Sequence, residues 1–280
     1  MNVDITNSQY ATLQHRNLLR IRAFALIIFH MLITTATTVS TAGASAPSQE
    51  RTNTPANTAQ DSRELVVVLH GLGRTNASMW RITRALEHSG YRVVSCTYPS
   101  RTMPAEEIAS KWLPQLLAEN NAATAPRVHF VTHSLGGIIV RLWLRDCGAP
   151  ANMGRIVMIA PPNHGSEIPD HLGHNPFFRF FTGINGMRLG TSPDSLPCSL
   201  GALPPHVELG IIAGNRSLNP LFSSWIPGPD DGKVSVASTK LEGMCDHIVM
   251  PYSHTWLTIR SAVIEKIIAF LHDGKFKAAE

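Results

Sequence analysis

The chain has 280 residues, of which 44% are hydrophobic and 16% charged, so it can bury one substantial core and does not require a second domain. Its formal net charge is +4, but three of the 24 basic and one of the 20 acidic side chains lie within the first 44 residues, so the remainder is close to neutral. Because the basic side chains form no cluster with interleaved aromatic residues, the composition argues against a nucleic-acid-binding protein.

The first 44 residues predict a secretory signal peptide. Three arginines at positions 16–22 precede the apolar run 23–33, and the small-residue sequence Ala-Gly-Ala follows at 42–44. Cleavage after Ala44 would export the protein to the periplasm or the medium. An uncleaved membrane anchor is the alternative, although the apolar run is shorter than the roughly 20 residues of a comfortable span.

The rest of the chain divides into a short linker and one folded domain. Positions 45–63 are polar and carry no large apolar residue, which is typical of a flexible linker. From residue 64 to the end at 280, strand and helix patterns alternate, which predicts an α/β fold with a mostly parallel sheet and helices on both faces. We expect strands at 64–70, 91–97, 127–132, 155–160 and 207–213, and helices at 79–88, 106–119, 137–146 and 261–272.

The segment 132–136 (Thr-His-Ser-Leu-Gly) places Ser134 between an apolar strand and the start of a helix. A sharp strand-to-helix turn strains the backbone of such a serine and lifts its hydroxyl clear of the sheet, and small neighbours give it room. Gly136 and Gly137 supply that room, while Thr132 stands where the usual pattern has its first glycine. Ser134 is therefore a candidate nucleophile.

A second motif follows the apolar strand 65–69, which ends in the sequence His-Gly-Leu-Gly at 70–73. With these two motifs the chain resembles the α/β-hydrolase superfamily, and within it bacterial lipases and esterases, from about residue 64 to 273. The resemblance implies an oxyanion hole made by the backbone amides of Leu72 and Leu135. Each such donor contributes roughly 3 to 4 kcal/mol to transition-state stabilisation.

A nucleophilic serine needs a base and a carboxylate that orients it, and in this fold they follow in the order Ser, Asp, His. Similar lipases carry Asp-Gly-x-Val in a loop that opens into a short β-like run, which selects Asp231 over Asp230. They place the base on a polar loop before the last helix, which selects His254. By contrast, His247 would begin a strand, and His272 would end the terminal helix.

Two further histidines adjoin these motifs. His133 precedes the candidate nucleophile, and we expect it to be a packing residue that hydrogen-bonds within the turn. His70 precedes the glycine of the oxyanion loop, and we expect it to shape that loop without taking part in proton transfer.

The segment at about 163–206 is irregular and rich in proline and glycine, which predicts a lid-like insertion. Its aromatic cluster includes Phe177, Phe178 and Phe181, which are candidates for a substrate-binding wall. Packing of these rings onto the sheet is an equally good interpretation. The preceding Pro-Pro-Asn-His-Gly-Ser at 161–166 is similar to a lipase segment that shapes the pocket wall.

Four cysteines occur in the sequence, and in an exported protein this even number permits two disulfides. Cys198 and Cys245 lie in loop-rich segments and are the expected pair. Cys96, in a strand, and Cys147, at a helix end, are expected to be buried free thiols. The cysteine and histidine spacings match no metal motif, so neither a metal nor another cofactor is expected.

Together these features predict a serine carboxylic-ester hydrolase that acts on small esters or lipids with an apolar acyl chain, because the insertion is aromatic and has few charges. The resemblance leaves two alternatives: an acyltransferase with the same triad, and a non-catalytic hydrolase-like binding protein, against which the filled triad positions argue. A monomer is expected, and transient contact with a lipid surface is compatible with the aromatic insertion.

Overall fold

The computed structural model describes residues 61–276. The predicted signal peptide and nearly all of the predicted linker lie outside these residues. A six-stranded parallel sheet forms the centre of the fold, in the order β2-β1-β3-β4-β5-β6. Its strands are β1 (Leu65–Leu69), β2 (Arg92–Ser95), β3 (Val128–His133), β4 (Met153–Ile159), β5 (Leu209–Gly214) and β6 (Asp246–Met250).

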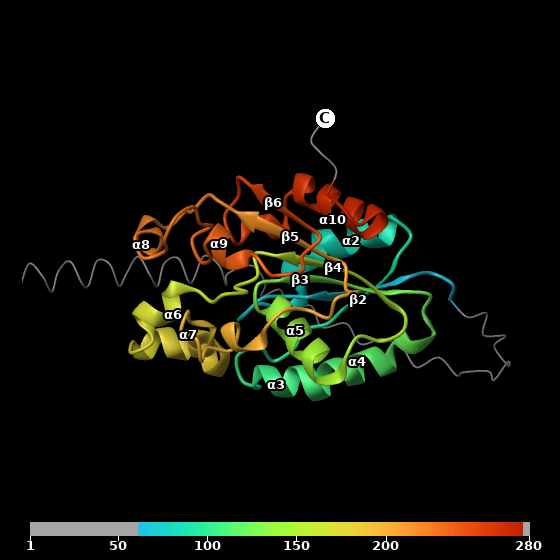
Figure 1. Ribbon diagram of the computed structural model, residues 1–280, viewed down its shortest axis with the longest axis horizontal. Coiled ribbons are helices and arrows are strands. Elements are labelled where there is room, and N and C mark those ends of the chain that lie inside the picture. The colour runs from blue at the N-terminus through green and yellow to red at the C-terminus, as the bar shows by residue number, and fades with distance from the viewer. Residues whose placement is uncertain (1–60, 277–280) are drawn as a thin grey trace, which may run out of the picture. The chain divides into compact units, whose positions relative to one another are not determined.

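Helices cover both faces of this sheet, as the alternating pattern predicted (Figure 1). One face carries α3 (Ala105–Glu107), α4 (Leu113–Glu119) and α5 (Leu135–Cys147), while the other carries α2 (Trp80–His88) and α10 (Ser261–Asp273). A π-helical stretch at Ile108–Trp112 joins α3 to α4. The predicted fold class is therefore confirmed, with shifts of a few residues at the element ends.

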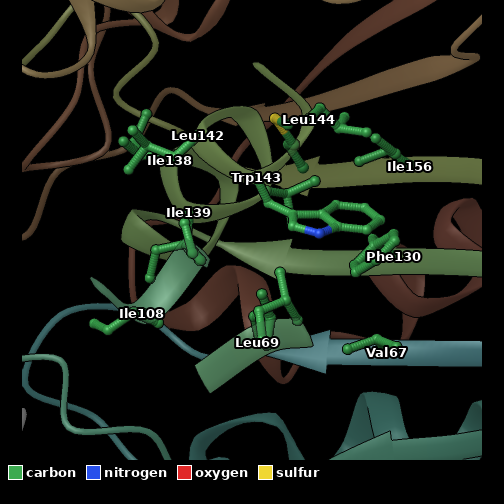
Figure 2. Packing of buried hydrophobic residues seen from close by; sticks show 14 of the residues in the cluster. Val67, Leu69, Ile108, Phe130, Ile138, Ile139, Leu142, Trp143, Leu144 and Ile156 are labelled. Carbon is green, nitrogen blue, oxygen red and sulfur yellow. The ribbon is translucent and has the colours of Figure 1, made fainter. Parts of the chain in front are cut away.

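The two cores follow from the alternation of side chains along each strand. On β1, Leu65, Val67 and Leu69 pack against the α5 side, whereas Val66 and Val68 pack against α2 and α10. Figure 2 shows the α5 side, where the rings of Phe130 and Trp143 lie 5.2 Å apart. Each fully buried large apolar side chain contributes about 1.5 to 3 kcal/mol to folding.

The insertion is more regular than the sequence suggested. Two helices, α6 (Glu167–Leu172) and α7 (Pro176–Gly186), occupy the segment expected to be irregular, and they lie together at the lower left of Figure 1. Polar side chains begin both helices, because Ser166 and Asn175 each accept hydrogen bonds from the first-turn amides. Proline is favourable at the first position of α7, and Gly183 interrupts this helix with a kink at φ 66° and ψ −160°.

The run after Asp231 was also expected to be β-like, and this expectation is wrong. Only an isolated bridge between Asp230 and Ser235 forms there, followed by the short helix α9 (Val236–Thr239). The hydroxyl of Ser235 accepts a hydrogen bond from the amide of Ser238, so Ser235 starts a helix where the sequence suggested a strand. A second short helix, α8 (Pro220–Ser223), precedes this loop.

The expected disulfide between Cys198 and Cys245 is absent, since all four cysteines are free thiols in the part of the chain that the structure describes. The sulfur of Cys198 faces the carbonyl oxygen of Thr191 at 3.8 Å. Cys245 is exposed just before β6, where its amide donates to Leu209. The expectation for Cys147 is wrong too: it is exposed at the end of α5. Between residues 61 and 276, no helix combines the length and the apolar character of a membrane span.

Candidate active site

Ser134 lies where β3 ends and α5 begins, in a backbone conformation that serine rarely adopts. Its φ is 53° and its ψ is −119°, a strained state that typically costs about 1 to 3 kcal/mol. The surrounding backbone enforces it, because the Ser134 amide donates to the carbonyl of Ile159 at 2.9 Å and the Ser134 carbonyl accepts from Gly137 at 3.0 Å. Although Ser134 occupies the N-cap position of α5, its side chain caps no amide. Its hydroxyl is therefore not used for capping.

Glycines make the close approach around Ser134 possible. A Cβ on Gly136 would lie 2.9 Å from the carbonyl oxygen of Leu69, so α5 can start this close to β1 only with glycine there. A Cβ on Gly71 would lie 3.2 Å from the Cβ of Ser134. The His-Gly loop after β1 thus packs directly against the serine turn. Thr132, which replaces the usual first glycine, fits at a fully buried position.

Asp231 and His254 meet in a buried hydrogen bond of 2.7 Å between Oδ2 and Nδ1. The other carboxylate oxygen accepts the amides of Lys233 and Val234, each at 2.9 Å, and the Asp231 side chain is 0% exposed. A second link runs from the amide of His254 to the carbonyl of Asp231 at 2.9 Å. An ionised carboxylate can only accept, so Nδ1 of His254 carries the proton and Nε2 is left as the basic nitrogen.

The alternatives that the sequence offered for the acid and the base, Asp230, His247 and His272, make contacts elsewhere. The carboxylate of Asp230 accepts from the hydroxyl of Ser223 and the amide of Gly232, and so belongs to the turn. His247 forms a 3.0 Å hydrogen bond with the hydroxyl of Thr239, and His272 lies on the surface beside Asp273. Of the residues weighed for these roles, Asp231 and His254 are the ones that the structure brings together.

His133 links the turn of Ser134 to the loop of His254. Its Nε2 donates to the carbonyl oxygen of His254 at 3.0 Å, and the two rings lie 4.6 Å apart. The expectation that His133 bonds within its own turn is therefore wrong, because its partner is 121 positions away in the sequence. Burial, together with the charges of His254, Arg74 and Lys233, holds the pKa of His133 well below its usual value, so this ring is a neutral tether.

The loop with the predicted oxyanion donor Leu72 is fixed by bonds between side chains and backbone groups. Nδ1 of His70 donates to the carbonyl of Gly71 at 2.8 Å, its Nε2 accepts from the amide of Tyr98 at 3.2 Å, and the two rings stack 4.1 Å apart. Burial lowers the pKa of His70 to about 4, so the ring is neutral near pH 7. The amide of Gly73 donates to Ser100 at 3.0 Å. The second predicted donor, Leu135, is the first residue of α5.

Helix α7 adjoins this loop. Atoms of Arg101 and Phe181 lie within 4 Å of the position that a Cβ on Gly73 would take. The predicted wall residues differ in exposure: Phe178 is 6% exposed, Phe181 is half-buried and Phe177 is 53% exposed. Phe178 therefore packs inward, while Phe181 approaches Gly73 with its backbone oxygen.

Two charged residues that the sequence did not single out also lie beside the site. Arg74 follows the oxyanion loop, and its guanidinium donates to the hydroxyl of Thr255 at 3.1 Å, directly after His254. Lys233 lies two residues after Asp231. Each lies within three residues of a motif that the sequence analysis identified, Arg74 after Gly71 and Lys233 after Asp231. That short spacing in the sequence could have indicated that they lie near the site. No group of three or more possible metal-ligating residues occurs within 61–276.

Comparisons with known proteins agree with this architecture. The alpha/beta hydrolase family model matches residues 66–265. No curated protein sequence matches the chain. Among solved structures, it is similar to the lipase BlEst2 of Bacillus licheniformis in its mature form, with 17% identity and a TM-score of 0.58 over 78% of this chain and 93% of that one.

Two further structures have the same fold at similar distance. The product of the gene lin2722 of Listeria innocua is 17% identical, with a TM-score of 0.53 over 78% of this chain and 97% of its own. A carboxylesterase of Nitrososphaera gargenis is 15% identical, with a TM-score of 0.52 over 77% of this chain and 92% of its own. At these identities the likeness demonstrates the fold, and the chemistry must be argued from the site.

Proposed function

Because this chain belongs to the α/β hydrolase family, we propose that it hydrolyses carboxylic esters with Ser134 as nucleophile, His254 as base and Asp231 as the residue that orients the base. The observation that carries the proposal is the pairing of a strained, non-capping Ser134 with a buried hydrogen bond between His254 and Asp231. A serine that merely started a helix would use its hydroxyl as a cap and would need no positive φ.

In the first half of the reaction, Nε2 of His254 takes the proton of the Ser134 hydroxyl as its oxygen attacks the ester carbonyl. The imidazolium that forms is stabilised by the Asp231 carboxylate, whose position is held by the amides of Lys233 and Val234. His254 then protonates the departing alcohol, which leaves an acyl group on Ser134. Water, deprotonated by the same histidine, attacks this acyl group and releases the acid and the free serine.

The negative oxygen that develops during each attack needs preorganised donors. The amides of Leu72 and Leu135 are the proposed donors, because the first directly follows Gly71, which packs on Ser134, and the second begins α5. Removal of one such donor typically lowers kcat about 10²- to 10³-fold. Both are backbone groups, so the identity of these two side chains has little direct effect on the stabilisation.

The acyl part of the substrate is proposed to be apolar. Helix α7 adjoins the proposed oxyanion loop through the backbone oxygen of Phe181, and its outer surface exposes the rings of Phe177 and Phe180. These rings offer apolar area to an acyl chain, and a transient contact with a lipid surface would use the same exposed rings.

The test is hydrolysis of p-nitrophenyl esters of increasing acyl length by the full chain, its Ser134→Ala variant and a Ser224→Ala control. Ser224 is exposed and bonds only within its own turn in the described structure. We expect turnover in the parent and the control, and its loss in Ser134→Ala. Hydrolysis that survives in Ser134→Ala would refute the proposed nucleophile, and absence of hydrolysis by the folded parent would refute the proposed activity.

A further inference from the structure

Three hydrogen bonds fix His254, and they come from two different parts of the chain. Its amide and its Nδ1 both donate to Asp231, at 2.9 and 2.7 Å. Its carbonyl oxygen accepts from Nε2 of His133 at 3.0 Å. The two bonds to Asp231 hold the histidine against the proposed acid, but they do not determine its distance from Ser134. Among the hydrogen bonds of residues 61–276, the one from His133 joins His254 to the turn of Ser134.

His133 is the last residue of β3, which makes it a firm anchor for this bond. The strand lies inside the sheet between β1 and β4, and His133 pairs with Ile159 of β4. The residue is 3% exposed. A ring that projects from a paired and buried strand has little freedom to move, and groups on regular elements hold a site more precisely than groups on loops. The position of His254 is therefore tied to the sheet through this ring.

The other ring nitrogen of His133 faces the loop that carries Leu72. A Cβ on Gly71 would lie 2.8 Å from Nδ1 and 3.4 Å from Cε1 of this ring, so only the hydrogen of a glycine fits there. Because the carbonyl oxygen of His254 can only accept, the ring proton is on Nε2 and Nδ1 is a bare acceptor. One ring thus contacts the loops of Leu72 and His254, while its own backbone leads into the turn of Ser134.

A histidine at this position is costly if it serves packing alone. Nδ1 of His133 is buried and has no hydrogen-bond partner in the described part of the chain. A buried acceptor without a partner destabilises the folded state, and an apolar side chain of similar size would avoid that cost. The ring also lies 4.6 Å from the ring of His254, which becomes an imidazolium in the proposed reaction. Burial holds the pKa of His133 well below its usual value, so the neutral ring does not repel this charge.

We propose that His133 is a positioning residue, and that its bond to the carbonyl of His254 sets the distance of the base from Ser134. The proposal rests on the ester hydrolysis proposed above. His133 itself takes no proton from the serine or the substrate, since its Nε2 is occupied and its Nδ1 faces Gly71. Without this bond the carbonyl end of His254 is released, and its Nε2 can move away from the serine hydroxyl. A displacement of about 1 Å in such a site lowers turnover about 10²-fold.

The alternative is that His133 contributes only to folding, and matched variants of the full chain separate the two ideas. His133→Gln keeps an N–H donor as many bonds from Cα as Nε2 is, whereas His133→Met fills a similar volume without a donor. His129→Met is the matched control, because His129 is also a buried histidine of β3 but bonds to Glu64 and the amide of Arg155. The readouts are kcat and KM for p-nitrophenyl butyrate, with the folded fraction of each variant from circular dichroism.

We expect kcat of His133→Met to fall about 10²-fold while KM stays within about twofold of the parent, because the ester still binds but the base is displaced. His133→Gln should recover kcat to within about tenfold of the parent, since it restores one hydrogen bond. His129→Met should lose stability in urea, yet its kcat per folded molecule should stay within about twofold of the parent. An unchanged kcat per folded molecule in His133→Met, or an equal loss in His133→Met and His133→Gln, would overturn the proposal.

Two further measurements keep the test decisive if His133→Met does not fold. His133→Asn then replaces it, because the shorter amide ends where Nδ1 of histidine lies and cannot reach the carbonyl of His254. His133→Gln should exceed His133→Asn in kcat by about tenfold, and equal values would contradict the proposal. In the parent, nitrogen NMR at pH 7 should show His133 as the neutral Nε2–H tautomer, assigned through its Overhauser contacts with the ring of His254. An Nδ1–H tautomer or a charged ring would exclude the bond.

Ser134→Ala distinguishes failure of the positioning role from failure of the proposed function. If the folded parent hydrolyses no ester, or if Ser134→Ala remains active, the proposed function fails and the positioning role fails with it. If Ser134→Ala is inactive while His133→Met is as active as the parent, the proposed function stands and the positioning role alone is refuted.

Discussion

Two regions of the molecule are held in place in different ways. One is the edge of the sheet at the carboxyl ends of the strands, which carries Ser134, Asp231 and His254, and the other is the helical cover formed by α6 and α7. At the edge, Ser134, His254 and Asp231 are fixed by backbone hydrogen bonds and buried contacts. The cover is attached to residues 100–106 largely by side chains. Asn185 bonds three backbone groups, and Arg188, just after α7, pairs with Glu106, while one backbone bond runs from the amide of Ile184 to the carbonyl of Arg101.

This difference indicates that side chains of the cover can change, and with them the proposed substrate preference, while the proposed catalytic residues at the edge stay in place. Side chains on the outer face of α7, such as Phe180 at 70% exposure, can be replaced without disturbing any hydrogen bond among Ser134, His254 and Asp231. Substitutions at the edge have less freedom, because Asp231, His254 and His133 are joined there by buried hydrogen bonds. The predictions below test this division.

The largest effect is expected at the edge, for Asp231→Asn. The amide would favour the wrong tautomer of His254 and could not stabilise its imidazolium, so kcat should fall about 10⁴-fold. Asp230→Asn is the matched control, because an amide oxygen can still accept from Ser223 and Gly232, and kcat should change little. The measurement is steady-state hydrolysis of a p-nitrophenyl ester, and the opposite ranking would move the acid by one residue.

Within the cover, the two faces of α7 should differ sharply. Phe178→Ala removes a ring that is 6% exposed and should lower the free energy of unfolding by about 3 kcal/mol. Phe180→Ala removes an exposed ring and should change it by less than about 0.5 kcal/mol. Urea denaturation of the two variants measures both values, and equal losses would mean that the outer face of α7 is packed in solution.

At the edge, an added methyl group should lower the free energy of unfolding more at Gly136 than at Gly137. Gly136→Ala puts a Cβ 2.9 Å from the carbonyl oxygen of Leu69, and the backbone shift should cost about 2 kcal/mol of unfolding free energy. Gly137→Ala meets the flexible side chain of Met158 at 3.2 Å and should cost less. Denaturation midpoints compare the pair, and similar midpoints would show that α5 is not held close to β1.

A smaller effect is expected from pH. His70 has a folded-state pKa of about 4, below its ordinary value, so its neutral form contributes stability above about pH 6.5 that is lost as the pH falls toward 4. Between pH 7 and pH 5 the loss should be about 2 kcal/mol. His70→Gln should lose less over the same range, whereas His171→Gln, at an exposed position, should behave as the parent does. An identical loss in His70→Gln would contradict a buried neutral ring.

Much of the edge could be predicted from the sequence, because its strands and the turn of Ser134 depend on residues that are close together in the chain. A continuous apolar run identifies β1 and a run rich in β-branched residues identifies β3, and both strands are buried throughout. The small residues after Ser134 indicate a close approach that no larger residue permits. The order of Asp231 and His254 after the serine followed from the family resemblance. Their roles as acid and base remain predictions that the proposed variants test.

What sequence did not predict depends on distant partners. The bond from His133 to His254 and the approach of Arg74 to Thr255 join residues more than 100 positions apart, and no local pattern reports them. The helices of the cover were missed because their capping residues, Ser166 and Asn175, outweigh a composition typical of loops. The disulfide was a wrong inference from composition alone, since loop-rich surroundings do not bring two sulfurs together.

The most direct test of the central claim is covalent labelling of the full chain with a fluorophosphonate, followed by mass spectrometry of its peptides. Attack by an activated serine oxygen displaces fluoride and leaves a stable phosphonyl ester on that residue. The account predicts one labelled serine, Ser134, with much slower labelling in Asp231→Asn. A label on another residue, or none on a folded protein that hydrolyses esters, would contradict it.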